Sequence, residues 1–128
     1  MEEITLPSPD GRKIIILEYD GEARFGPAFF VGGSRGFAWP LGSSTLGEDV
    51  HWSPDSRYAV LLLFRSRDTS KSPDVDLVAI DTNDGSLLTI DHNANGLIEP
   101  RGFVSSGEYE YRYIDRGSSV MRSWRPKS

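Results

Sequence analysis

Two short stretches carry residue types and spacings that suit chemistry, and the first is Gly32 to Gly36. Its sequence, Gly-Gly-Ser-Arg-Gly, matches the G-x-S-x-G pattern of a nucleophile elbow centred on Ser34. An elbow needs a strand, a strained turn that exposes the serine, and a helix behind it, but "FAWPL" follows. His51 or His92 would have to act as the base without a supporting pattern. We therefore interpret the stretch as a glycine hairpin and predict no catalytic residue.

The second stretch, Asp91 to Gly102, matches the first half of a calcium loop. Asp91, Asn93 and Asn95 occupy alternate oxygen-ligand positions, and Gly96 suits the sharp turn. Gly102 stands where a bidentate glutamate should close the loop, and the sequence predicts no flanking helices. We interpret the stretch as a polar loop between strands, and we expect neither a metal nor a cofactor.

Acidic residues gather at places that the pattern of apolar runs indicates are loops. The net charge of −5 disfavours nucleic acid as a ligand, because phosphates need a basic surface. It suits a basic protein partner, and loops often carry binding residues. We expect the partner-binding residues to be these carboxylates: Asp20, Glu22, Glu48, Asp49, Asp68, Asp74 and Asp76.

The bulk composition is that of one globular domain, residues 1–128. Without cysteine, disulfides and thiolate metal sites are excluded. The N-terminal stretch has no apolar region of the signal-peptide type, and the longest apolar run, Ala59 to Phe64, is too short to span a bilayer. We expect a cytoplasmic protein with no membrane partner.

The periodicity predicts strands and no long helix. "KIIILEY" (13–19) and "YAVLLLF" (58–64) are continuous apolar runs, typical of strands covered on both faces. "AFFVGG" and "GFAWPL" predict a hairpin across 28–41, and "VDLVAIDTNDGSLLTI" predicts another across 75–90, with its turn at Asn83 to Gly85. "SSTLGEDV" (43–50) suits a single helical turn.

The last third of the chain holds a tyrosine strand and a basic end. "EYEYRYI" (108–114) alternates tyrosines with charged residues, which predicts rings on one face and charges on the other. Five basic residues lie within this strand or after it: Arg112, Arg116, Arg122, Arg125 and Lys127. We interpret this basic end as a solvated tail or an edge strand. We expect the tyrosine strand to protect one edge of a sheet.

A turn-then-strand phrase occurs twice. Ser8-Pro9-Asp10-Gly11 and Ser53-Pro54-Asp55-Ser56 lie 45 positions apart, and each precedes a basic residue and an apolar strand. A decayed third copy starts at Ser105. Spacing in the forties with several strands per unit is typical of propeller blades.

"WSPDSRYAVLLLF" and the hairpin after it resemble the repeat of Tol-type and prolyl-oligopeptidase-type β-propellers. In that repeat a Trp-Ser-Pro-Asp-Gly turn precedes the second strand of each blade; here Ser56 replaces the glycine. The resemblance covers residues 51–90 well and 6–46 more weakly. It implies an all-β fold of antiparallel sheets in a partial, propeller-like array of about three units, with a β-sandwich as the alternative.

An array of three units is too short to close, because closed propellers usually have four or more blades. Open arrays leave unpaired edges and uncovered faces, which favours a binding protein over an enzyme. Small acidic chains with incomplete repeats resemble bacterial immunity proteins, so we expect a toxin or effector domain as partner, blocked by loops at one end of the sheets. The alternatives are a self-completing homo-dimer, and a small hydrolase or calcium-dependent carbohydrate binder that uses Ser34 or the Asp91 loop.

Overall fold

The computed structural model describes residues 3–22, 27–67 and 74–126, and within them the chain forms strands and turns without a helix. Two open antiparallel sheets result, one with β1 to β7 in chain order and one with β8 to β10. This confirms the predicted all-β class. The strands are β1 (Glu3–Pro7), β2 (Ile14–Glu22), β3 (Ala28–Arg35), β4 (Thr45–Trp52), β5 (Tyr58–Phe64), β6 (Val75–Asp81), β7 (Ser86–Asn93), β8 (Gly96–Ser105), β9 (Glu108–Asp115) and β10 (Ser118–Trp124).

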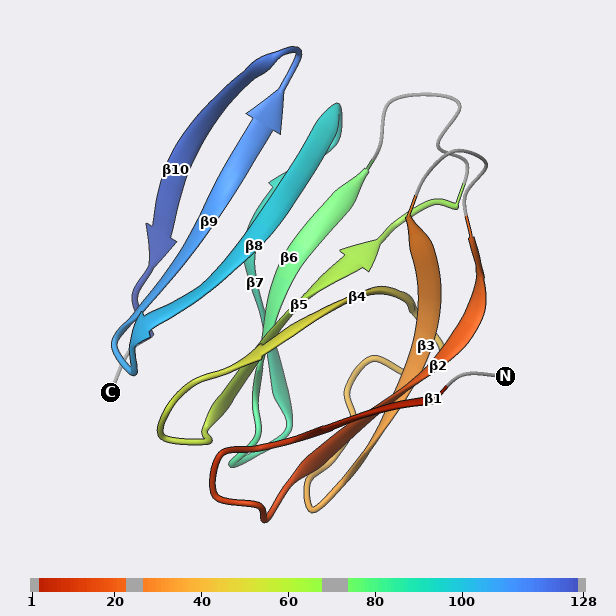
Figure 1. Ribbon diagram of the computed structural model, residues 1–128, viewed down its shortest axis with the longest axis vertical. Helices are drawn as coiled ribbons and strands as arrows, with labels where there is room; N and C mark the ends of the chain where they lie inside the picture. Colours follow the sequence, from red (N-terminus) through yellow and green to blue (C-terminus); the bar gives the residue numbers. More distant parts are fainter. Residues whose placement is uncertain (1–2, 23–26, 68–73, 127–128) are drawn as a thin grey trace.

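The strands form three units that stack on one another. The large sheet is joined between β3 and β4 by the single residue pair Phe30 and Leu46. It therefore divides into a first unit (β1–β3) and a second unit (β4–β7), and β8–β10 make the third unit. Figure 1 shows the three groups side by side, from the blue third unit to the red first unit.

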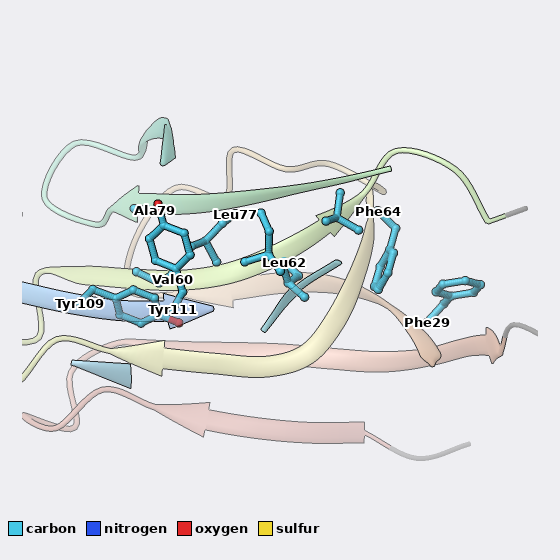
Figure 2. Packing of buried hydrophobic residues seen from close by; sticks show 10 residues of the cluster. Phe29, Val60, Leu62, Phe64, Leu77, Ala79, Tyr109 and Tyr111 are labelled. Carbon is cyan, nitrogen blue, oxygen red and sulfur yellow. The ribbon is translucent and has the colours of Figure 1, made fainter. Parts of the chain in front are cut away.

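The second unit is the middle layer, and its central strands are buried on both faces. Val60 and Leu62 of β5 face the third unit and pack in one cluster with Tyr109. Leu61 faces the other way and packs with Leu17 of the first unit. In the view of Figure 2, the tyrosine rings of the first cluster lie beside Val60, at the end away from the phenylalanines. Burial on both faces is why "YAVLLLF" is continuously apolar, as predicted.

The end units have a covered face and an open face. In β2, Ile15 and Leu17 are fully buried, but Ile14 and Ile16 are only half-buried. The prediction that "KIIILEY" is covered on both faces is therefore wrong, because nothing in the described chain stacks on the outer side of the first unit. In β9 the tyrosines face the core and the charges face outward, as predicted. However, β9 is the central strand of its sheet, so the edge there is β10.

The segment 36–44 is a loop and not the second arm of a hairpin. Its Trp39 ring packs against Gly32, where a Cβ atom would lie 2.6 Å from the ring. Because Gly32 has no side chain, the Trp39 ring can pack directly against the backbone of β3. The predicted helical turn at 43–50 is also wrong, because Thr45 begins β4, which pairs with β5.

The two Ser-Pro-Asp turns form the same hydrogen-bond network, which gives the sequence repeat a structural basis. In residues 8–13 and 53–58, the serine Oγ donates to the aspartate two positions later, at 2.7 and 2.5 Å respectively. The same oxygen accepts the backbone N–H five positions later, at 3.1 and 2.9 Å. The third copy, at Ser105, is a short turn between β8 and β9 and lacks this network.

Direct contacts join the two turns. Ser56 takes the left-handed conformation that Gly11 has in the first turn, with φ of 64° and 75° respectively. Its Oγ accepts the Asp10 N–H at 3.0 Å, a contact that a glycine could not make. The Lys13 ammonium donates to the Ser56 carbonyl at 3.1 Å and to Thr82 Oγ1 at 2.7 Å. This junction fastens the first unit to the second.

Replacing the lysine of this junction tests its contribution. We expect Lys13→Met to lower the free energy of unfolding by about 1–2 kcal/mol, because two buried acceptors lose a charged donor while the side-chain stem remains. Urea unfolding measures the change. Arg12→Met is the matched control, since the Arg12 side chain is exposed; equal losses in both variants would contradict the junction's role.

Candidate functional site

Ser34 does not sit in a nucleophile elbow. It lies in β3 and its Oγ donates to the Phe37 carbonyl at 2.8 Å. The following described segment is a loop, so the strand–turn–helix arrangement of the motif is not formed. The glycine-rich stretch instead serves packing, through the contact of Gly32 with Trp39.

The Asp91 loop uses its oxygen-bearing side chains internally. The Asn93 side chain is buried, and its Nδ2 donates to the carbonyls of Leu97 and Ile114 at 3.1 and 2.7 Å. Gly96 lies so close to β9 that a Cβ atom would be 2.1 Å from the Ile114 oxygen. The loop thus forms the corner where the chain passes from the second unit to the third. In the described part of the chain, no group of three or more His, Cys, Asp or Glu residues is placed to hold a metal ion.

Asp91 is the acceptor at the centre of a polar cluster between the second and third units. Its Oδ2 accepts from Tyr111 OH at 2.8 Å and from Arg122 at 2.7 Å, and the guanidinium lies 3.9 Å from the Tyr113 ring centre. Burial works to raise the pKa of Asp91, but the hydrogen bonds from Arg122, Tyr111 and the His92 N–H outweigh it and lower that pKa. Burial and the Asp91 carboxylate together raise the pKa of Tyr111.

Both histidines are held by other side chains. His51 Nδ1 lies 2.9 Å from the hydroxyl of the fully buried Tyr109. Burial lowers the pKa of His51 against the opposing effect of Asp49, and burial raises the pKa of Tyr109. His92 Nδ1 lies 2.5 Å from Asp76 and its Nε2 lies 3.5 Å from Asp74. Among the described residues, no serine hydroxyl is hydrogen-bonded to either histidine ring.

Three of the carboxylates predicted to bind a partner are engaged within the chain. Asp20 forms an ion pair with Arg67, which brings the end of β2 to the end of β5. The side chain of Asp76 is only 6% exposed, and it pairs with Arg65 at 2.8 Å as well as with His92. Asp74 lies near His92. Asp20 and Asp76 are thus each paired with an arginine, whereas Asp74 Oδ1 is buried without a hydrogen-bond partner among the described residues.

The other predicted carboxylates are outward-facing or not described. Glu22 is exposed at the end of β2, and Glu48 and Asp49 are exposed on β4, where the pairing with β5 shifts register. None of these three forms an ion pair with another described residue. Asp68 lies outside the described residues. The predicted set is therefore divided: Asp20 and Asp76 are held in ion pairs, whereas Glu48 and Asp49 are exposed beside a register shift of β4.

A hollow on the outer face of the first unit is the feature that sequence reasoning missed. It has a volume of about 390 Å³. Ile16 and Val31 line it beside Gly33, at which an added Cβ atom would meet nothing within 4 Å. Glu3 and Glu18 lie directly opposite each other on β1 and β2 at one end of the hollow.

The two glutamates form a like-charge pair without a counter-ion among the described residues. Like charges directly opposite on neighbouring strands destabilise a sheet. Arg35 also lines the hollow, but it pairs with Ile14 at the other end of the face. The signal was present in the sequence, because a turn at residues 8–13 sets the register that places Glu3 opposite Glu18.

The lowered pKa of Asp91 predicts a specific acid sensitivity. A carboxylate whose pKa is lower in the folded state adds stability above its unfolded value, near 3.8, and this stability is lost as the pH falls through the folded value. We expect the stability of the native chain to fall more steeply below about pH 4 than that of Asp91→Asn. Urea unfolding between pH 2 and pH 7 measures this, and parallel curves would contradict it.

The internal use of Asp91 and Asn93 predicts that calcium does not stabilise the fold. We expect millimolar calcium to leave the melting temperature unchanged, because ligand binding to the folded state would raise it. A thermal-shift titration measures this, with magnesium as the control. A melting temperature that rises with calcium and not with magnesium would contradict the prediction and support a calcium site at Asp91.

Comparison with protein-family models, with curated proteins and with solved structures found no match. Within the described ranges, no helix is long and apolar enough to cross a membrane.

Proposed function

We propose that this chain is a non-catalytic protein-binding protein, and that it acts as an immunity protein that blocks a toxin with a basic surface. The observation that carries the proposal is the hollow on the outer face of the first unit, with its uncompensated pair Glu3 and Glu18. A complete propeller would cover such a face with another blade. Here a partner protein covers it.

The hollow suits the side chain of an arginine or lysine from the partner. Long basic side chains lay their apolar stems on apolar surface and keep their charged ends among polar groups. Ile16 and Val31 offer the apolar lining, and Glu3 and Glu18 offer two carboxylates for the charged end. A cation placed there removes the repulsion between the glutamates, so binding gains energy that the free chain lacks.

In the described part of the chain, the groups that could act in catalysis are used internally, which supports a binding role. Ser34 donates its hydroxyl proton to the Phe37 carbonyl, and the two histidines are held by Tyr109 and Asp76. An immunity protein needs no catalysis, because occupying the active site of the toxin is enough.

The test begins with affinity purification of partners from the source organism and continues with measured affinities. We expect Glu3→Lys with Glu18→Lys to weaken binding about 100-fold, since juxtaposed like charges cost several kcal/mol. Glu48→Lys with Asp49→Lys makes the same charge change on β4 and serves as the matched comparison.

Equal affinity of the Glu3/Glu18 variant and the native chain would contradict the proposed face. Loss of binding only in the Glu48/Asp49 variant would show that the partner contacts β4 and not the hollow. The immunity role has a separate readout: a partner that stops cell growth when expressed alone, and not when co-expressed with this chain, supports it. A harmless partner argues against it.

A further inference from the structure

Four strands have an edge with no neighbouring strand in the described structure: β1 and β7 in the large sheet, β8 and β10 in the small one. Proteins discourage pairing at such edges with proline, charge, bulges and short strands. β1 is five residues long and carries Glu3 and Pro7. β8 carries Pro100 and two register shifts, and β10 carries Arg122.

β7 is less protected over Ser86 to Thr89. This segment contains neither a charge nor a proline, and its pairing with β6 is regular until the register shift at Ile90. Leu87 and Leu88 point to opposite faces and are 42% and 50% exposed. Each face of the strand therefore exposes a leucine beside a free backbone edge.

A hollow of about 510 Å³ with a mixed lining, which includes Asp81 and Arg125, lies between β7 and the end of β10. Leu88 and Ile90 line it from β7, and Trp124 lines it from β10. The Trp124 ring packs edge-on against Tyr58, with ring centres 5.4 Å apart, so this wall is fixed. A strand added to β7 would place its side chains next to this wall.

We propose that β7 pairs antiparallel with β7 of a second copy of this chain, so that the two large sheets become one. The two-fold axis passes through Leu88, which then faces its own counterpart. Leu87 faces Thr89 and Ser86 faces Ile90, so no like charges meet and Asp91 stays outside the paired segment. Residues directly opposite in an antiparallel pair lie on the same face, so both Leu88 side chains project beside the hollow.

The geometry favours a second copy and a closed dimer. A two-fold axis perpendicular to the joined large sheet places both small sheets on the same face of that sheet. Each Trp124 then lies beside the β7–β7 contact. An isologous contact closes at two copies. The other edges resist further pairing. Five residues a side is small against the 20–30 of an ordinary interface, so we expect dissociation constants of about 10–100 μM.

Sedimentation equilibrium over a concentration series tests the dimer. We expect monomer and dimer for the native chain, monomer for Leu88→Lys, and native behaviour for Val120→Lys. The control is closely matched, because Val120 on the β10 edge is 51% exposed. A native chain that stays monomeric at millimolar concentration, assemblies larger than two, or equal loss in both variants would overturn the proposal.

Single cysteines test the register, because the native chain has none. Opposite Cβ atoms in an antiparallel pair lie about 4.5–5.5 Å apart, close to disulfide range. We expect Leu88→Cys to form a disulfide-linked dimer under mild oxidation, and Leu87→Cys and Val120→Cys to stay largely monomeric. Equal cross-linking of all three would overturn the register. The β7 edge lies at the far side of the large sheet from Glu3 and Glu18, so these results do not depend on the proposed partner.

Discussion

The structure depends on the need of each sheet to bury an apolar face against a neighbour. β5 and β6 satisfy this need twice, since Val60 and Leu62 pack on the third unit while Leu61 packs on the first. Full burial of one leucine contributes about 2 kcal/mol, so the middle layer supplies much of the stability. The first and third units have only one neighbour each. The open face and open edges of the molecule are therefore the consequence of three units stacked without closure.

Local chemistry made the repeat visible in the sequence. A serine, a proline and an aspartate in this order can satisfy one another and the next backbone N–H without help from elsewhere, and both turns do so. The β6–β7 hairpin, with Gly85 in its turn, and the alternation of β9 are local in the same sense, and both were predicted, whereas the glycine hairpin predicted across 28–41 did not form. The departure at Ser56 had no explanation from the sequence. Its reason is tertiary, because Ser56 Oγ accepts the Asp10 N–H from the other turn.

The predictions that failed concern residues whose side-chain contacts do not follow from the strand pattern. Trp39 is only seven positions from Gly32, but no pattern in the sequence shows that its ring will pack against that glycine. Asp76 looks like a surface charge in the sequence, but β5 brings Arg65 to it and β7 brings His92. The hollow at Glu3 and Glu18 differs, because its register follows from one local turn. The hollow itself depends on tertiary structure, because Val31 and Gly33 of β3 complete it beside β2.

The two outer faces of the stack differ in how their charges are compensated, and this difference bears on where the proposed partner binds. On the third unit, Glu99 pairs with Arg101 and lies within 4.0 Å of Arg112, and Glu108 pairs with Arg125. That face is neutralised from within and suits contact with water. On the first unit, Glu3 and Glu18 face each other with no cation between them in the described structure. A surface that keeps such repulsion loses stability in the free chain and regains it when a basic group arrives. The proposed basic partner therefore suits the outer face of the first unit better than that of the third.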